Sequence, residues 1–591
     1  MNEDKRTSRS VLPRLLSYIV LYRKKLWIAL FLTVVVTGLG LMKPMIIGNA
    51  IDVCITGETA AMRSPNERFQ LLLADAGVYV LVMAALFLCA RKMHLLMQET
   101  GQQMIYDLRN QLFEHTENLP MSFFDTTPVG KIVTRITNDA ESINEVFSQT
   151  LISLVQNLMK VLGFALIMLC LNVRMALWSF LTVPIAVALT AAFRHLSRRA
   201  FRNTRNKLTA LNTFLSEHIS GMQIIQLFAQ EKRKDREFRE KSDELFKATY
   251  QELLVNAFFR PLIYMISVAA LVIVVIVGGR NVLNQTITLG TFFIFLQYIV
   301  SLFNPIEELA EQFSTIQSAI ASAEKIFTLL DEPVQRDDAE KPDGPAGVRG
   351  EIEFDHVWFA YQGEDWILRD VSFRIEPGQH VAFVGATGAG KSSILNLIGR
   401  YYDIQKGVIR LDGIDIRDIP LDRLRTFIGQ VQQDVFLFSG SIRRNIRLLD
   451  DISDERIRQA AQDVNASRFI DRLPAAYDEA VGERGSALSA GQRQLLSFAR
   501  TLAHDPAILI LDEATSNIDT ETEQWIQEAL VHLITGRTSI MVAHRLSTIQ
   551  HADCIMVMHN GRIRERGTHQ ELLARNGIYK KLYLIQLAGE K

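Results

Sequence analysis

The sequence has 591 residues, too many for one hydrophobic core, and 64 Lys and Arg against 65 Asp and Glu give a formal net charge of -1. This balance provides no overall basic field, so nucleic acid is not expected as a partner. The four cysteines, Cys54, Cys89, Cys170 and Cys554, form no CxxC or Cys/His spacing, which excludes a disulfide scaffold and a zinc site.

Long apolar stretches fill the first half of the chain. Each is close to the ~20 residues that a helix needs to cross about 30 Å of hydrocarbon. Segments such as LVIVVIVGG (271–279) are apolar on every face, unlike the helices of a soluble protein. We therefore predict a transmembrane domain over 1–330 with six spanning helices, near 26–47, 71–90, 150–171, 175–193, 262–279 and 289–303.

The orientation follows from basic residues that precede the first span, among them Arg14, Arg23, Lys24 and Lys25. By the positive-inside tendency they place the N-terminus in the cytoplasm. The outside loops are then short, whereas the inside segments near 91–149 and 194–261 are long and charged, and they extend the membrane helices into the cytoplasm. Residues 11–22 have the pattern of an interfacial helix and not of a cleaved signal peptide.

A stretch rich in Pro, Gly and charge (331–350) ends the helical pattern and predicts a linker. Beyond it, strand-length apolar runs alternate with helical patterns: EIEFDHVWFAY, HVAFVG, AILILDE and TSIMVAH. This alternation predicts an α/β domain over 351–591 with a largely parallel core sheet.

The segment HVAFVGATGAGKSS joins a strand to a helix and contains G-x-x-x-x-G-K-[ST], a phosphate-binding loop. Its glycines let successive N–H groups converge on phosphate oxygens, helped by the helix N-terminus. A lysine adds positive charge and a serine offers a hydroxyl to Mg²⁺. The predicted nucleotide contacts are Gly385, Ala386, Thr387, Gly388, Ala389, Gly390, Lys391, Ser392 and Ser393.

Two acids end the apolar run AILILDE. Asp512 is suited to hold magnesium through a water, and Glu513 can polarise the attacking water as a general base. An exposed strand end is the alternative interpretation. We favour the magnesium and base roles because the phosphate loop lies upstream and needs such a partner.

The motif LSAGQ (488–492) lies between these two elements, and with them the chain resembles the ATP-binding cassette (ABC) proteins. Six spans followed by one cassette resemble a bacterial half-transporter of the exporter type. The resemblance implies that Ser489, Gly491 and Gln492 bind the γ-phosphate of ATP held by an opposite subunit. A single chain would then not complete a site, and two cassettes would enclose two nucleotides, with ATP and Mg²⁺ as cofactors.

Further positions match the family one by one. The resemblance implies that Tyr361 stacks on adenine, Gln433 contacts Mg²⁺ or the attacking water, His544 is the switch histidine on the γ-phosphate, and Asp519 is the acid of the loop between the two sites. A strand-edge tyrosine is the alternative for Tyr361. Three segments resemble those that couple cassettes to membrane helices, namely 119–139, 217–231 and 480–487.

The signature departs from the usual LSGGQ-[RK]-Q-R at Ala490, which replaces a glycine, and at Leu495, which replaces a basic residue. Such variants resemble subunits of heterodimeric multidrug exporters. A second half-transporter subunit is therefore expected as the partner. We favour a heterodimer, and a homodimer stays possible because an added Cβ is a small change.

The sequence predicts the transported compound less precisely than it predicts the nucleotide chemistry. Ionisable groups inside spans are functional candidates, and the third span contains Lys160. After Pro305 the sixth helix continues with Glu307, Glu308 and Glu311, which either attract a cationic amphipathic molecule or lie on a cytoplasmic extension of the helix. Aromatic residues of the sixth span suit flat hydrophobic compounds or lipid contact equally. We expect export of hydrophobic or amphipathic compounds of the multidrug type across the bacterial plasma (inner) membrane, with the cassette in the cytoplasm. A lipid or lipopeptide flippase and an ATP-gated channel or regulatory module are the alternatives.

Overall fold

The computed structural model describes residues 11, 13–15, 17–18, 20–56, 63–335, 344–448, 452–512, 520–542 and 550–589. The chain divides into two compact units. The first comprises 1–117 and 129–332, and the second comprises 118–128 and 333–591. Residues 118–128 thus leave the helical unit and pack with the C-terminal one.

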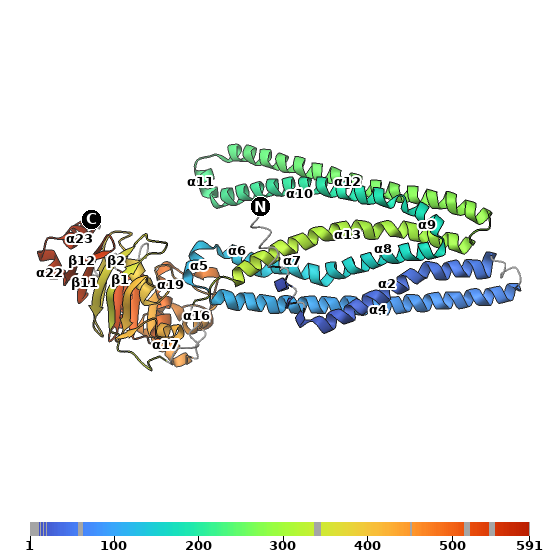
Figure 1. The fold of residues 1–591 in the computed structure, drawn as a ribbon. Coiled ribbons are helices and arrows are strands. Elements are labelled where there is room, and N and C mark those ends of the chain that lie inside the picture. Colours follow the sequence, from blue (N-terminus) through green and yellow to red (C-terminus); the bar gives the residue numbers. More distant parts are fainter. Residues whose placement is uncertain are drawn as a thin grey trace. The chain divides into compact units, whose positions relative to one another are not determined.

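The described residues of the first unit form helices and the turns between them (Figure 1). Six of its described segments are long and apolar enough to cross a membrane, which confirms the predicted number of spans. Its elements are α2 (Arg23–Ala50), η1 (Ile51–Thr56), α4 (Pro65–Glu117), α6 (Val129–Thr134), η2 (Arg135–Asp139), α7 (Ala140–Glu145), η3 (Val146–Thr150), α8 (Leu151–Leu171), α9 (Val173–Phe180), α10 (Val183–Ser220), α11 (Met222–Leu227), α12 (Glu231–Leu283) and α13 (Leu289–Leu330).

The longest helices, α4 and α12, have 53 residues each. At 1.5 Å per residue such a helix is roughly 80 Å long, more than twice the thickness of the hydrocarbon layer. The helical extensions beyond the membrane that the charged segments predicted are therefore present as continuous helix. The fourth span differs from its prediction, because the helix ends at Phe180 and resumes at Val183, where Pro184 occupies the first turn.

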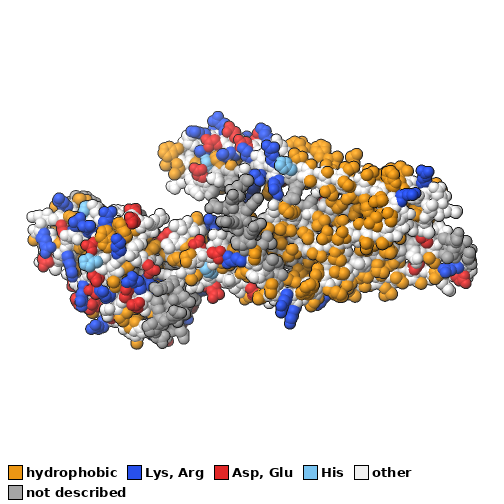
Figure 2. Space-filling view, in the orientation of Figure 1, with side chains coloured by type: hydrophobic (Ala, Val, Ile, Leu, Met, Phe, Trp, Pro, Cys, Tyr) orange, Lys and Arg blue, Asp and Glu red, His pale blue; other side chains and the backbone are white. Residues whose placement is uncertain are grey.

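Side chains on the outside of the spans are mostly apolar, and Figure 2 shows them as a continuous hydrophobic surface over these helices. The aromatic residues expected on a lipid- or cargo-facing surface of the sixth span behave differently. Phe295, Tyr298 and Phe303 are buried within the unit. Tyr298 donates a hydrogen bond to the Leu41 carbonyl oxygen (2.6 Å), and its ring lies 5.1 Å from that of Phe164. They form part of the helical core instead.

The N-terminal segment is helical at its described residues between 11 and 20, as the interfacial pattern predicted. Tyr18 donates to Gln111 of α4 (2.5 Å). Arg14 pairs with Asp331 (2.7 Å), directly after α13, and its guanidinium lies 4.5 Å from the ring centroid of Phe327. The segment therefore contacts the C-terminal parts of both the second and the sixth spanning helices.

The second unit contains a six-stranded sheet of order β12-β11-β3-β10-β9-β6, in which β11, β3, β10, β9 and β6 are parallel and β12 is antiparallel. A four-stranded antiparallel sheet, β2-β1-β4-β5, accompanies it. The strands are β1 (Ile352–Phe359), β2 (Leu368–Ile375), β3 (His380–Val384), β4 (Lys406–Leu411), β5 (Ile414–Asp415), β6 (Ile428–Val431), β9 (Ile508–Asp512), β10 (Thr538–Val542), β11 (Cys554–His559) and β12 (Arg562–Gly567), and a short pair β7 (Gly440–Ser441) and β8 (Ala480–Val481) lies apart.

This arrangement confirms the α/β prediction for the C-terminal domain and refines it at one strand. The run EIEFDHVWFAY forms β1, which belongs to the antiparallel sheet and not to the parallel core. Its alternating burial is typical of a strand with one solvated face. The helices of this unit are α5 (Met121–Thr126), α14 (Lys391–Ile398), α15 (Leu421–Thr426), α16 (Ile442–Arg447), α17 (Asp454–Asp463), α18 (Ser467–Ile470), α19 (Ala490–Ala503), α20 (Thr520–Ile534), α22 (His569–Ala574) and α23 (Ile578–Gly589), with short 3₁₀ turns η4 (Ala476–Asp478) and η5 (Glu483–Gly485).

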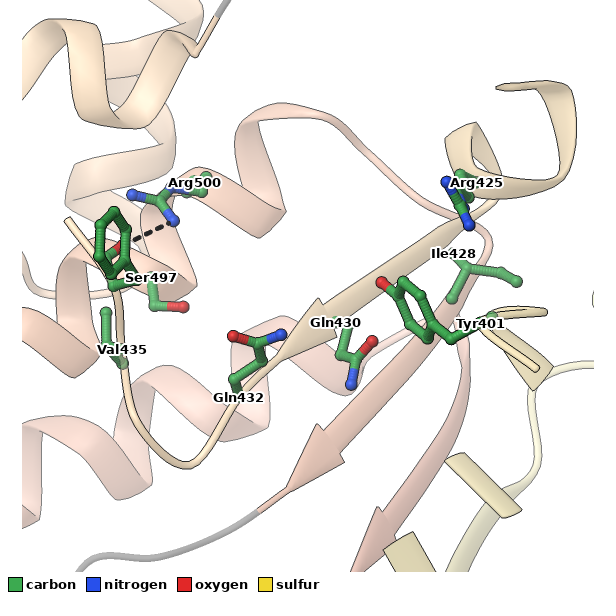
Figure 3. A pocket seen from close by; sticks show the side chains of 10 residues that line it. Tyr401, Arg425, Ile428, Gln430, Gln432, Val435, Ser497 and Arg500 are labelled. Carbon is green, nitrogen blue, oxygen red and sulfur yellow. Dashed lines mark hydrogen bonds between the residues drawn. The ribbon is translucent and has the colours of Figure 1, made fainter. Parts of the chain in front are cut away.

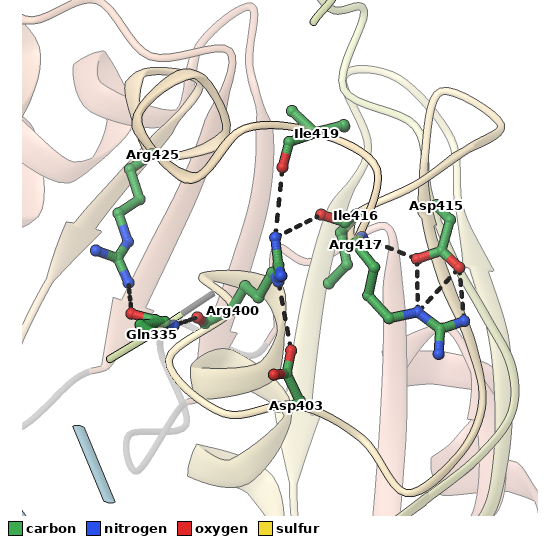
Figure 4. Close-up of polar contacts among 8 residues, drawn as sticks. All are labelled: Gln335, Arg400, Asp403, Asp415, Ile416, Arg417, Ile419 and Arg425. Carbon is green, nitrogen blue, oxygen red and sulfur yellow. Dashed lines mark hydrogen bonds and ion pairs between the residues drawn. The ribbon is translucent and has the colours of Figure 1, made fainter. Parts of the chain in front are cut away.

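Gln335 contributes to the attachment of residues 118–128 to this unit, and Figure 4 shows its side-chain contacts. Its backbone N–H donates to the Asn118 carbonyl oxygen (2.8 Å), and its side chain donates to the Arg400 carbonyl oxygen (3.1 Å) and accepts from Arg425 (3.3 Å). Arg400 is only 2% exposed, and its guanidinium donates to Asp403 and to two backbone carbonyls. A buried cation with these partners anchors the region without an unpaired charge. All four cysteines are free.

Candidate functional site

The predicted nucleotide residues begin at one edge of the parallel sheet. Phe383 in β3 is level with Val542 in β10, and Val542 is level with Asp512 in β9. Next to β9, Val431 of β6 is level with Leu511. The loops that follow these four strands therefore start side by side at the carboxyl ends of the strands, where open α/β sheets bind their ligands.

The phosphate loop connects β3 to α14 and has the backbone that its glycines permit. Gly388 and Gly390 have φ of 80° and 99°, in the left-handed region. A Cβ on Gly385 would lie 2.4 Å from a backbone carbonyl oxygen of β11. The Lys391 ammonium lies over the loop and donates to the carbonyl oxygens of Gly385 (2.7 Å) and Ala386 (3.1 Å). The loop is thus closed around a cation at the start of a helix.

Lys391 and Asp512 interact although 121 positions separate them in the sequence. Burial lowers the pKa of the Lys391 ammonium, and the Asp512 carboxylate partly opposes this shift. Each of these groups comes from a different strand-to-loop junction. The structure therefore brings together the two motifs that sequence analysis assigned to one phosphate site.

Tyr361 lies beside the first turn of α14. Its hydroxyl is 3.1 Å from the Ser393 Oγ, and its ring meets the Tyr402 ring edge to face, with centroids 5.0 Å apart. The side chain is 44% exposed. A tyrosine held at its hydroxyl and one edge, with accessible ring surface next to a phosphate loop, fits the predicted contact with a purine base.

A contact that the sequence did not predict connects α5 to this group. The Tyr402 hydroxyl donates to the Asp125 carboxylate. Burial, followed by this hydrogen bond, raises the pKa of the Tyr402 phenol, so the proton stays on the tyrosine. The interactions therefore run from Asp125 through Tyr402 and Tyr361 to Ser393, two residues after the loop lysine. No local pattern around either residue signals such a pairing.

The signature residues cap helix α19. The Ser489 hydroxyl accepts from the Gln492 N–H (3.2 Å), and the Gln492 side chain accepts from the Ser489 N–H (3.0 Å), which is a capping box. Ser489 is exposed at the helix N-terminus, Gly491 is buried, and Ala490 points to the exterior. Leu495 is fully buried. A basic side chain there would place an unpaired charge in the core, which gives this departure from the family pattern a packing role.

Gln433 follows β6 in an exposed loop beside a pocket of about 280 Å³ (Figure 3). The neighbouring Gln430 and Gln432 point into this pocket, and the Gln430 Oε1 is buried without a hydrogen-bond partner among the described residues. Arg500 of α19 fixes one wall by donating to the Asn445 carbonyl oxygen (2.8 Å). The other lining residues are Gly399, Tyr401, Arg425, Ile428, Val435, Phe436 and Ser497. The loop of Gln433 is therefore next to a preformed surface cavity.

Three predicted residues, Glu513, Asp519 and His544, lie outside the described residues. The strands that lead to them are described: β9 ends at Asp512 and β10 at Val542. The segment 480–487 contains β8 and the turn η5.

The residues present fit ATP and magnesium chemically. A lysine, a glycine-rich loop and a helix N-terminus are donors for phosphate oxygens. Ser392, Gln433 and Asp512 would supply a hydroxyl, an amide and a carboxylate to Mg²⁺, which normally keeps water and phosphate oxygens as its other ligands. Among the described residues no group of three or more His, Cys, Asp or Glu could hold a metal, so a protein-only cage is not formed there.

Fold and site together define a P-loop ATPase joined to a six-span membrane domain. Residues 26–306 match the family model described as "ABC transporter transmembrane region", and residues 368–516 match the one described as "ABC transporter". The chain belongs to the ABC transporters, as an exporter half-transporter that hydrolyses ATP and needs a dimer partner to form a complete exporter.

Two curated relatives cover both halves. The chain is 40% identical to the "Probable multidrug resistance ABC transporter ATP-binding/permease protein YheH" of Bacillus subtilis (strain 168), over 84% of this chain and 74% of the relative. It is 34% identical to the ATP-dependent lipid A-core flippase of Desulfotalea psychrophila (strain LSv54 / DSM 12343), over 98% of this chain and 100% of the relative.

Among solved structures, the ATP-bound structure of a bacterial Atm1-family ABC exporter resembles the chain with a TM-score of 0.77 and 26% sequence identity. The match covers 96% of this chain and 99% of the other.

Proposed function

We propose that the chain is one half of a dimeric pump that exports hydrophobic or amphipathic compounds of the multidrug type across the bacterial plasma membrane, with N-terminus and cassette in the cytoplasm. The similarity to a relative named for multidrug resistance, which includes both membrane and nucleotide-binding halves, carries this proposal. The apolar exterior of the spans and the closed phosphate loop are consistent with it.

In this proposal bound MgATP supplies the phosphoanhydride whose hydrolysis drives the cycle. The residues of the loop 385–393 hold the phosphates, and Tyr361 positions the base. Ser392, Gln433 and Asp512 hold the metal. Glu513 accepts a proton on its carboxylate from the attacking water, and His544 contacts the outer phosphate.

The partner is proposed to be a different subunit. Ser489, Gly491 and Gln492 would complete the partner's nucleotide site, with Asp519 between the two sites. In this chain Ser489 and Gln492 bond each other, which keeps their helix N-terminus preorganised for an incoming phosphate. Ala490 adds a Cβ on the exposed side of this motif, where a partner's site would meet it. Because altered signatures of this kind resemble those of heterodimeric exporters, the added Cβ of Ala490 favours a heterodimer.

Coupling to the membrane is proposed to involve α5, which packs with the cassette, and α11, whose Ile224 and Leu227 are 64% and 76% exposed. Exposed apolar side chains of this size on a short cytoplasmic helix indicate a docking segment. Closing and opening of the cassettes would move the spans as rigid bodies.

The test is transport by the purified full chain in proteoliposomes. We expect ATP-dependent accumulation of a hydrophobic or amphipathic fluorescent compound inside inverted vesicles, with ATPase activity that rises with the compound and disappears in Glu513→Gln. If the chain alone is inactive or monomeric and the product of the neighbouring gene restores turnover, the heterodimer is supported. ATP hydrolysis without movement of any such compound would contradict the proposal.

A lipid flippase is the second candidate, because the lipid A-core flippase relative covers 98% of this chain. The two candidate functions are distinguished by varying the lipid composition of the bilayer. The ATPase rate of a flippase changes with the lipid head group, whereas the ATPase rate of a multidrug pump changes with the added compound in any bilayer.

A further inference from the structure

Lys160 is the tenth of the 21 residues of α8 and lies near the middle of the third span. It is 11 residues from the outer end of this helix at Leu171, which corresponds to roughly 16 Å along the axis. A charged side chain at this depth is costly, so ionisable residues in spans normally have a partner or a function. Among the described residues Lys160 has neither a hydrogen bond nor an ion pair.

The surroundings show that Lys160 belongs to the buried face of α8. Its neighbours at i-3, i+3 and i+4 all pack inward. Asn157 is 1% exposed and donates to Glu308 of α13 (2.7 Å). A Cβ on Gly163 would lie 2.4 Å from Leu41 of α2. Because residues three and four apart share a helix face, Lys160 points toward α2 and α13.

The exposed side of α8 is marked separately by leucines at helical spacing that are 48%, 60%, 65% and 37% exposed. They lie on the opposite side of the helix from Lys160. Snorkelling of the Lys160 ammonium along the exposed side of α8 is therefore disfavoured, because Lys160 lies on the opposite side of the helix. These leucines are Leu158, Leu162, Leu166 and Leu169.

Helix α2 offers a second polar group at the same depth. Thr37 is 3% exposed, and its hydroxyl has no hydrogen-bond partner among the described residues. It lies one turn before Leu41 and one turn after Thr33, whose hydroxyl is 3.2 Å from the Met93 Sδ of α4. Because Leu41 is level with Gly163 and the first and third spans run in the same direction, Thr37 lies at about the level of Lys160. A Cβ on Gly40 would meet nothing within 4 Å, which leaves space beside these groups.

We propose that Lys160 and Thr37 bind the acidic head group of amphipathic cargo, a carboxylate or phosphate, between the first, third and sixth spans. An ammonium and a hydroxyl without partners are donors for an anion. The carboxylate of Glu308 on this face is already engaged by the Asn157 amide. The inference rests on the proposed export function and names the class of cargo within it.

The test uses three amphiphiles with one tail, namely laurate, dodecanol and dodecylamine, added to the full exporter in phosphatidylcholine proteoliposomes that lack anionic lipid. The readout is the concentration of each that half-maximally stimulates ATP hydrolysis. We expect laurate to act at a concentration at least tenfold lower than dodecanol. Lys160→Gln should remove this difference, Thr37→Val should reduce it several-fold, and Lys160→Arg should retain it.

Two further variants keep the test decisive. Lys92→Gln removes an exposed lysine of α4 and should leave the laurate preference unchanged. Lys160→Glu should shift the preference to dodecylamine, which a folding defect cannot do. Acetate without a tail should not stimulate, which would identify the ligand as a head group and not a free anion.

The inference is overturned if Lys160→Gln retains the laurate preference, if it weakens the response to all three amphiphiles equally, or if acetate alone stimulates. A wild-type exporter that responds to none of the amphiphiles and transports none of them would contradict the proposed function itself, and with it this inference.

Discussion

In the cassette all five residues of β10 are buried, whereas the most apolar stretch of α4 has none of its residues buried within the chain. Ile540 is completely inaccessible and Leu81 is 70% exposed, although both side chains are large and aliphatic. The cassette removes such groups from water by packing them together, and the helical unit does so by presenting them to hydrocarbon. Polar groups consequently have opposite meanings: they are ordinary on the cassette surface and informative inside the spans.

The largest effect on ATP hydrolysis is expected from substitution of Glu513, the proposed general base of the cassette. Glu513→Gln removes the proposed base but leaves the phosphate loop, so we expect MgATP binding to persist and hydrolysis to fall by about 100-fold or more. Phosphate release and nucleotide binding are measured on the same preparation. Glu455→Gln, at an exposed position in α17, is the control and should hydrolyse normally. Undiminished hydrolysis in Glu513→Gln would remove the basis of the site assignment.

The opposite burial of aliphatic residues can be tested directly. Ile540→Ala creates a cavity in a packed sheet and should lower the free energy of unfolding of the cassette by about 2–5 kcal/mol. Leu166→Ala, at a 65% exposed position of α8, should cost less than about 1 kcal/mol because lipid or detergent fills the space. Denaturant unfolding followed by fluorescence compares the two. Equal losses would show that Leu166 is buried, in the dimer or otherwise.

A pair of glycines sharpens the comparison within the membrane unit. A Cβ on Gly290 would lie 2.0 Å from the Gly48 carbonyl oxygen, whereas one on Gly38 would meet nothing within 4 Å. The close approach is held by Asp52, which accepts from the Gly290 N–H (2.7 Å) and the Thr288 hydroxyl (2.6 Å). We expect Gly290→Ala to cost about 1–3 kcal/mol by separating α2 from α13.

Gly38→Ala is the matched control and should be neutral or slightly stabilising in a helix. Thermal aggregation in detergent reports both variants. A neutral Gly290→Ala would contradict the packing of the first spanning helix against the sixth.

The smallest effect is expected at the contact between α5 and the nucleotide side. Tyr402→Phe deletes one hydrogen bond, worth about 1 kcal/mol, and should lower the ratio of cargo-stimulated to basal ATPase by roughly fivefold or less. Asp125→Asn keeps an acceptor and should have a weaker effect. Tyr106→Phe, at a 66% exposed position of α4, is the control. A change in basal hydrolysis alone would indicate a local structural role and not coupling.

Local signals predicted correctly that the cassette is an ATPase of the ABC type. The phosphate loop, the acid at the end of β9 and the capping residues of α19 are each encoded within a few consecutive residues, and the structure places the first two at one sheet edge. The run EIEFDHVWFAY was predicted as a strand, but its place in the separate antiparallel sheet depends on distant pairing partners, which the run itself does not specify. Three aromatic residues of the sixth span, Phe295, Tyr298 and Phe303, are buried and not on its surface, because their burial depends on neighbouring helices.

By itself the sequence determined the number of spans, the order of the two domains and the motifs for phosphate and metal, because hydropathy over ~20 residues and short glycine-rich motifs are local properties. The tertiary structure alone decided that residues 118–128 pack with the cassette, that Asp125 meets Tyr402, and that Lys160 lies on the inward face of α8. These features depend on contacts between residues far apart in the chain, which no local pattern specifies.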